Sequence, residues 1–214
     1  MRKLLLIIAA LLPQPVKLLI YRRLLGWQIG KNVQIGWSFL DAHKVTLGDN
    51  VRIGHLNLIR GLKQFSIGEG TYIANLNQMF GANYPGWDST LTIGSRVNFM
   101  SRHFIDIGGT VTIGDRAVIG GRDTQFWSHT REAVGGKEAL HPTTVRVGND
   151  AYIGARATLI SCAIPAGAVV GAGSVVTKSF PAEEARLLIA GNPATIRKRY
   201  EPAPEKETRE ENML

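Results

Sequence analysis

The feature that most constrains the fold is an aliphatic residue followed by glycine, which recurs every six positions. The pairs include Ile29-Gly30, Ile35-Gly36, Leu47-Gly48, Ile53-Gly54, Ile107-Gly108, Ile113-Gly114, Ile119-Gly120, Val147-Gly148 and Ile153-Gly154. After one shortened repeat at Leu159, the period continues through Ile164, Val170 and Val176. This period fits neither a helix of 3.6 residues per turn nor an ordinary alternating strand. The repeats are therefore not helices.

Short strands separated by corners explain the period, because each aliphatic residue then occupies an equivalent interior point of a three-sided coil. Gly48-Asp49-Asn50 and Gly148-Asn149-Asp150 suit corners that need left-handed backbone angles. The small residues two positions before the next aliphatic are predicted to fill the interior beside it; they are Val33, Val51, Ala117 and Ala151. Stacked coils would pair their strands in parallel at about 4.8 Å, and roughly six to seven coils fit between residues 29 and 181.

This repeat resembles that of the hexapeptide-repeat acyltransferases over about residues 27–198. The resemblance implies an all-β fold, a left-handed parallel β-helix; the hand comes from the resemblance alone, since general rules favour right-handed crossovers. We predict four regions: an amphipathic, basic N-terminal segment (1–26), the β-helix domain (27–180) with protruding loops at 74–92 and 121–146, a short C-terminal capping helix with a segment on the coenzyme-A side (181–200), and a flexible tail (201–214).

The N-terminal segment has two interpretations. The apolar run from Leu4 to Leu12 ends at Pro13, well short of the roughly 20 residues that cross a bilayer. The following residues recur at helical spacing among basic ones; they are Val16, Leu19, Ile20, Leu24 and Trp27. Residues 1–27 are expected to lie in a membrane interface, to cap the solenoid, or to do both. The expected location is the cytoplasm, with peripheral contact at the inner face of the cytoplasmic membrane under the first interpretation.

Composition limits the partners. Lys and Arg number 25 against 17 acidic residues, a formal net charge of +8, which favours an anionic partner. Aromatic residues make up 7% of the chain and do not alternate with basic ones as in a nucleic-acid platform, so nucleic acid is not expected. The single cysteine, Cys162, excludes an internal disulfide, and its apolar repeat predicts a small buried residue.

The second protruding loop, residues 121–146, contains the first candidate catalytic residue. It contains Gln125-Phe126-Trp127-Ser128-His129. Transfer from a thioester to a hydroxyl needs a base, and histidine, with an ordinary pKa near 6.5, suits that role. The segment resembles the maltose and galactoside acetyltransferase branch, in which the catalytic histidine follows a small hydroxyl residue. The resemblance implies that His129 is the general base in a direct transfer.

A second catalytic candidate is His103, within Ser101-Arg102-His103, which is expected to face the same cleft from a neighbouring coil. The sugar acetyltransferases have an asparagine there, and a structural role for His103 stays open. Arg102, Trp127 and Ser128 are the candidate substrate-binding residues. The role of His141 is left undecided.

Three C-terminal stretches resemble the coenzyme-A site of the family: Ile153-Gly154-Ala155-Arg156, Val170 to Lys178, and Gly191 to Lys198. The resemblance implies acetyl-CoA as co-substrate and sites between the subunits of a homotrimer. Solenoid corners alone also explain the glycines. The predicted cofactor-binding residues are Ala155, Gly171, Ala172, Thr177, Lys178, Arg197 and Lys198.

The function expected from these features is acetyl-CoA-dependent O-acetylation of a sugar hydroxyl on a glycan or lipid-linked acceptor in polysaccharide biosynthesis. Two alternatives remain: an N-acyltransferase acting on an amino sugar or nucleotide sugar, and a non-enzymatic, membrane-associated scaffold. Zinc-dependent carbonic anhydrase chemistry on the same solenoid needs converging histidines. The sequence has no His-x4-His pair, so no metal is expected.

Overall fold

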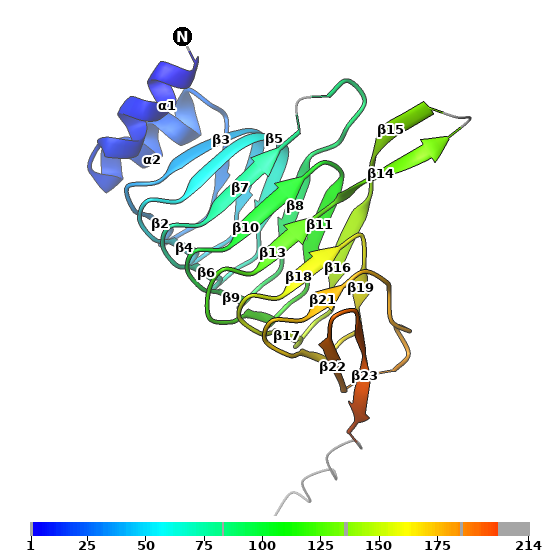
Figure 1. Ribbon diagram of the computed structural model, residues 1–214. Helices are drawn as coiled ribbons and strands as arrows, with labels where there is room; N and C mark the ends of the chain where they lie inside the picture. Colours follow the sequence, from blue (N-terminus) through cyan, green and yellow to red (C-terminus); the bar gives the residue numbers. More distant parts are fainter. Residues whose placement is uncertain (1, 83, 135–136, 185, 201–214) are drawn as a thin grey trace, which may run out of the picture.

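The protein is a three-sided parallel β-helix. The computed structural model describes residues 2–82, 84–134, 137–184 and 186–200. Figure 1 shows the strands stacked side by side, from two helices at the N-terminal end to a strand pair at the C-terminal end. Each coil contributes a short strand to each of three faces, as the six-residue period predicts.

The first face is a nine-stranded sheet. Its order is β2 (Gln34–Ile35), β4 (Arg52–Ile53), β6 (Tyr72–Ile73), β9 (Asn98–Phe99), β12 (Val118–Ile119), β17 (Tyr152–Ile153), β20 (Val169–Val170), β22 (Leu187–Gly191) and β23 (Ala194–Arg199). The strands from β2 to β20 mark seven successive coils, in agreement with the repeat count.

The other two faces are joined because β3 (Phe39–Leu47) and β5 (Leu58–Ile67) continue through a corner. The second face continues with β7 (Gln78–Gly81), β10 (Phe104–Ile107), β13 (Gln125–Trp127), β18 (Thr158–Ile160) and β21 (Val175–Val176). The third face includes β1 (Gln28–Ile29), β8 (Thr90–Ile93), β11 (Thr110–Ile113), β16 (Thr144–Val147) and β19 (Ala163–Ile164).

The core is a set of side-chain columns that run along the solenoid. The first-face column is 0–3% exposed and consists of Ile35, Ile53, Ile73, Phe99, Ile119, Ile153, Val170 and Ile189. The four predicted interior residues Val33, Val51, Ala117 and Ala151 are buried as well. Cys162 is buried, as predicted, and its burial raises the pKa of the thiol to about 12.

The corners use the predicted Asn and Asp residues. Oδ1 of Asp49 accepts a hydrogen bond from the backbone N–H of Lys31 (2.7 Å), one coil away. Asn50 and Asp150 have left-handed φ angles of 58° and 57°. At Gly114 a Cβ atom would lie 2.4 Å from Oδ1 of Asn149 in the next coil. A side chain there would separate the coils, which explains why glycine follows the aliphatic residue.

The two interruptions are narrower than predicted. Strand β7 pairs with β5 and β10, and β13 pairs with β10 and β18, so residues 78–81 and 125–127 belong to coils. Among the described residues that follow the two helices, the long excursions from the solenoid lie between β7 and β8 and between β13 and β16. The second excursion is an antiparallel hairpin of β14 (His129–Val134) and β15 (Lys137–Pro142).

The predicted C-terminal helix is wrong. Strand β22 pairs in parallel with β20 and antiparallel with β23. Leu187 and Ile189 are buried while Leu188 between them is partly exposed, a period of two that continues the first face. The end of that face is covered by a returning strand. The predicted tail, 201–214, lies outside the described residues.

Two helices lie at the other end, α1 (Arg2–Leu11) and α2 (Gln14–Arg23), with Pro13 at the start of the second. Their inward faces bury Leu6, Ala9, Lys17 and Tyr21. Nζ of Lys17 donates hydrogen bonds to the carbonyls of Ile35 (3.0 Å) and Gly36 (2.7 Å). The helix pair therefore covers the end of the first coil, and of the predicted helical stripe only Trp27 is fully buried.

Candidate active site

His129 lies where the chain leaves β13 to enter the hairpin. Its Nδ1 is 3.3 Å from Oδ1 of Asp106, and its side chain is 23% exposed. Nδ1 itself is buried and makes no formal hydrogen bond, so Nε2 is the ring nitrogen left for an acceptor. The carboxylate and imidazole thus form a pair with one accessible nitrogen, the arrangement that a general base requires.

Asp106 comes from β10, one coil before His129. Parallel pairing places Asp106 opposite Trp127, two residues before His129. Partial burial raises the pKa of Asp106, and the neighbouring imidazole opposes that shift. This residue was not among the predicted site residues. The available signal was an acidic side chain between the inward residues Ile105 and Ile107, which places it on the outer face of the strand.

Two tryptophans flank the imidazole. The ring centroid of Trp87 lies 6.1 Å from that of His129, and the centroid of Trp127 lies 5.9 Å away in an edge-on orientation. Trp87 belongs to the first excursion, so both excursions meet at this histidine. Gly108 makes the approach possible: a Cβ atom there would lie 2.6 Å from the Trp87 ring and 2.8 Å from Cβ of His129.

Ser128 does not reach the accessible side of the site, and its prediction as a substrate-binding residue is wrong. It is fully buried. Its hydroxyl donates a hydrogen bond to the Asp106 carbonyl (3.3 Å) and accepts one from the N–H of Gly109 (3.2 Å). The small hydroxyl residue therefore fixes the backbone beneath the pair.

Within one copy of the chain, His103 does not share the cleft with His129, and its role as a second catalytic residue stays a prediction. Its side chain is 1% exposed and lies in a ladder of buried polar residues. His103 N–H donates to Oδ1 of Asn77 (2.9 Å), and its Nδ1 accepts from the N–H of Thr124 (3.1 Å). Burial lowers the pKa of His103 to about 4. His103 lies at the corner before β10, where its side chain points inward. Asp106 lies near the other end of the same strand.

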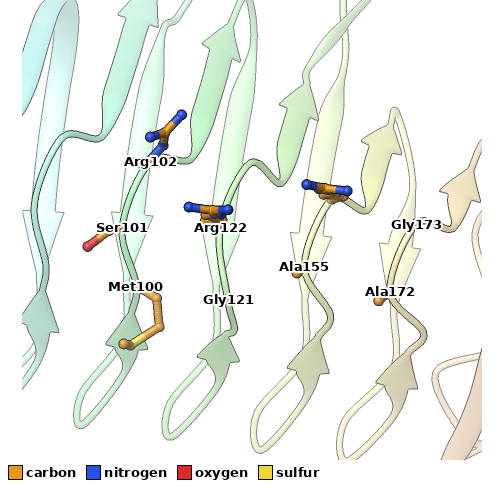
Figure 2. A pocket seen from close by; sticks show the side chains of 9 residues that line it. Met100, Ser101, Arg102, Gly121, Arg122, Ala155, Ala172 and Gly173 are labelled. Carbon is orange, nitrogen blue, oxygen red and sulfur yellow. The ribbon is translucent and has the colours of Figure 1, made fainter.

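A groove of about 850 Å³ runs along a different corner of the solenoid. Figure 2 shows its residues on successive coils, with Arg102, Arg122, Ala155 and Ala172 following one another along the axis. Gly121 and Gly173 also line it, together with Met100, Ser101 and Arg156. A floor of small residues beside arginines fits a narrow, phosphate-bearing ligand such as coenzyme A. Ala155 and Ala172, both predicted to bind the cofactor, therefore lie in one groove. Arg102, predicted to bind the substrate, lies in the same groove.

The other predicted cofactor-binding residues are spread over the C-terminal coils. Gly171 precedes the groove, and Thr177 follows β21 at the corner on the His129 side. Nζ of Lys178 lies 5.8 Å from the ring centroid of Phe180, and Nζ of Lys198 lies 4.8 Å from that of Tyr200. Nε of Arg197 donates to the carbonyl of Ala190 (3.0 Å). One copy of the chain does not bring all of these residues together.

The groove and His129 lie at opposite ends of β13. His141 pairs with Thr130 across the hairpin, and its Nε2 is buried without a hydrogen-bond partner. Within residues 2–82, 84–134, 137–184 and 186–200, no group of three His, Cys, Asp or Glu residues is placed to hold a metal ion.

Comparison with known proteins agrees with this architecture. The family model for the hexapeptide repeat of succinyl-transferase matches residues 144–178. In that stretch the chain is similar to the hexapeptide-repeat acyltransferases. It is 37% identical to serine acetyltransferase 4 of Arabidopsis thaliana over 94 residues, which make up 43% of this chain and 25% of that protein. The chain thus spans about a quarter of that curated relative.

Two solved structures share the fold of this chain. The polysialic acid O-acetyltransferase OatWY is 20% identical, with a TM-score of 0.50 over 87% of this chain and 96% of that chain. The N-acyltransferase AntD from Bacillus cereus, in complex with dTDP and 3-hydroxybutyryl-CoA, is 18% identical, with a TM-score of 0.50 over 81% and 83% of the two chains. The solenoid is the left-handed parallel β-helix, whose hand was expected from the family resemblance.

Proposed function

We propose that this protein is an acetyl-CoA-dependent O-acetyltransferase that acts on a sugar hydroxyl in glycan biosynthesis. The observation that carries the proposal is the His129–Asp106 pair, with its accessible edge between the rings of Trp87 and Trp127. Such flat aromatic surfaces, with an N–H at the rim, suit a ring-shaped polar acceptor. OatWY, which shares the fold, is a polysialic acid O-acetyltransferase, and this supports the same acceptor class.

In the proposed reaction, Nε2 of His129 accepts the proton of the acceptor hydroxyl as its oxygen attacks the thioester carbonyl carbon. The tetrahedral intermediate collapses by breaking the carbon–sulfur bond, and the coenzyme-A thiolate takes the proton from the imidazolium. Asp106 faces Nδ1, so it holds the tautomer with a proton on Nδ1 and stabilises the imidazolium as it forms. No covalent enzyme intermediate is needed.

We propose further that the complete site lies between subunits of a homotrimer. Within one copy, the residues of β13 separate the groove from His129 by on the order of 10 Å along the strand. A neighbouring copy can bring its own groove to the imidazole. In this arrangement Arg102, Arg122 and Arg156 would bind the phosphates of acetyl-CoA, and Ala155 and Ala172 would face its pantetheine arm.

The activity is tested with labelled acetyl-CoA and a panel of free glycans, lipid-linked glycans and amino sugars, with products identified by mass spectrometry. We expect transfer to a hydroxyl, loss of turnover in His129→Ala, retained acetyl-CoA binding by calorimetry, and normal activity in the exposed control His43→Ala. Transfer only to amines would establish the N-acyltransferase alternative. Absence of acetyl-CoA binding would refute the enzyme proposal and favour a scaffold.

The shared site is tested by mixing two inactive variants. His129→Ala lacks the base, and Ala172→Trp fills the groove. If each site combines a histidine from one copy with a groove from another, subunit exchange between the two variants restores part of the activity. Recovery should require a trimer in light scattering, at three times the chain mass of 23.4 kDa. A monomer, or mixed trimers without recovery, would refute the shared site.

A further inference from the structure

The N-terminal helices turn an apolar stripe away from the solenoid. On α1 the exposed residues follow one helical face: Leu4 (63% exposed), Ile7 (50%), Ile8 (49%) and Leu11 (68%). Helix α2 and its C-cap add Val16, Leu19 and Leu24, which are 45%, 59% and 66% exposed. Figure 1 shows this helix pair at the far end of the molecule from the C-terminal strands. A contiguous apolar surface of this kind marks an interaction site.

The apolar surface continues onto the first two coils. A groove of about 340 Å³ lies between α1 and a solenoid corner, with Ile7 and Leu11 on one side and Trp37 and Leu56 on the other. Trp37 is 61% exposed and Leu56 is 63% exposed. The face therefore combines helix and corner residues.

The corner leucines occupy a backbone conformation that suits other residues better. Leu56 and Leu76 have φ angles of 56° and 62°, a left-handed region in which glycine, asparagine and aspartate are favoured. At another corner of the same two coils, the residues with left-handed φ angles are Asn50 and Gly70. Neither local backbone preference nor core packing explains an exposed leucine here, whereas contact with an apolar partner does.

The charge around this face indicates an anionic partner. Residues 1–40 contain six basic residues and no Asp or Glu. Lys3, Arg22 and Arg23 are exposed, beside the apolar stripes of their helices. A second copy docked on the same face would bring these like charges together, whereas anionic lipid headgroups would neutralise them. Among the described helices, none is long and apolar enough to cross a membrane.

We propose that this surface docks on an anionic lipid bilayer. The docking face consists of Leu4, Ile7, Ile8, Leu11, Val16, Leu19, Leu24, Trp37 and Leu56, with Lys3, Arg22 and Arg23 at its margin. The helices lie in the plane of the interface, with aliphatic side chains below the headgroups and basic ones at the level of the phosphates. The proposal is independent of the acyltransferase activity, and would bring the protein to lipid-linked acceptors.

Vesicle flotation tests the proposal. The full chain should bind phosphatidylcholine vesicles that contain phosphatidylglycerol, bind pure phosphatidylcholine vesicles much less, and dissociate as salt is raised. Leu11→Ser and Leu24→Ser should each weaken binding by roughly tenfold, and Lys3→Gln and Arg23→Gln by roughly fivefold each. Leu140→Ser, at a solvent-exposed leucine on the hairpin (42% exposed), is the control and should bind normally.

Fluorescence gives a direct readout of insertion. Lipids brominated on their acyl chains should quench tryptophan emission of the wild-type chain, and Trp37→Phe should lose most of that quenching while it still floats with the vesicles. Equal binding by wild type and both leucine variants would refute the docking face. A change of mass in light scattering caused by Leu11→Ser or Leu24→Ser, with vesicle binding unchanged, would refute it in favour of an interface between copies.

Discussion

Asp106 faces His129 across the boundary between two coils, with Oδ1 and Nδ1 3.3 Å apart. Because Asp106 comes from β10 and His129 follows β13, the parallel pairing of these strands sets the geometry of the pair. The carboxylate can orient the imidazole and stabilise its protonated form, which gives a direct test of the proposed mechanism.

Replacing Asp106 with asparagine should lower kcat by roughly a hundredfold, because an amide favours the wrong tautomer and leaves the imidazolium without a counter-charge. His129→Ala should lower kcat by roughly 10²–10⁴-fold, and the double variant should be no worse than His129→Ala alone. Steady-state kinetics measures these effects. Asp150→Asn, which breaks an exposed ion pair with Arg116, is the control and should leave kcat unchanged; near-normal turnover in Asp106→Asn would contradict the assigned role.

Gly108→Ala should impair activity because its Cβ would overlap with the Trp87 ring and with His129. Overpacking of this kind costs about 1–3 kcal/mol of unfolding free energy. Adding Trp87→Ala to the first substitution should restore much of the stability, because it removes one of the two overlaps. The affinity for the acceptor should stay low in the double variant. Denaturant unfolding and the KM for the acceptor measure the two effects. If Gly108→Ala binds and unfolds like the wild type, the two excursions do not meet as described.

His103 should make stability depend on pH. Its pKa is lowered to about 4 in the folded protein, so between that value and its ordinary pKa of 6.5 the unfolded chain binds a proton that the folded one does not. Stability is therefore lost as the pH falls through this window, by at most about 3 kcal/mol. His103→Asn, whose side chain can continue the ladder from Asn77, should flatten the curve between pH 6.5 and 4. The exposed control His43→Asn should keep the wild-type slope; identical slopes for all three proteins would contradict the burial of His103.

Ala172→Leu should raise the KM for acetyl-CoA by roughly tenfold or more, since a branched side chain would fill the floor of the groove. The residue is exposed, so the melting temperature should stay within a few degrees of the wild type. Ala166→Leu, at an exposed alanine on another corner, is the matched control. Unchanged kinetics in Ala172→Leu would exclude this groove as the binding site.

The six-residue period predicts the coils, the core columns and the corner chemistry because each of these depends on residues within a single repeat. The six-residue period does not determine which residues of neighbouring coils lie opposite each other. For this reason Asp106 was not predicted as the partner of His129. His103 was misplaced because a corner decides whether a side chain points inward or outward.

The C-terminal error has a similar origin. The spacing of Ala182, Ala185 and Leu188 indicates a helix, but pairing with β20 imposes a strand on Leu187–Gly191. Tertiary pairing here overrides the local pattern. The position of His129 could be predicted, because its neighbours in sequence carry the resemblance to relatives.

The parallel stacking of β10 on β13 also determines which changes to the chain are tolerated. A residue inserted within either of these two coils would shift Asp106 relative to His129 and misalign the pair. A residue inserted at the turn of the β14–β15 hairpin would leave both strands in register. The hairpin, and with it the surface beside His129, can therefore change in length while one coil spacing keeps the Asp106 carboxylate and the His129 imidazole at a constant separation.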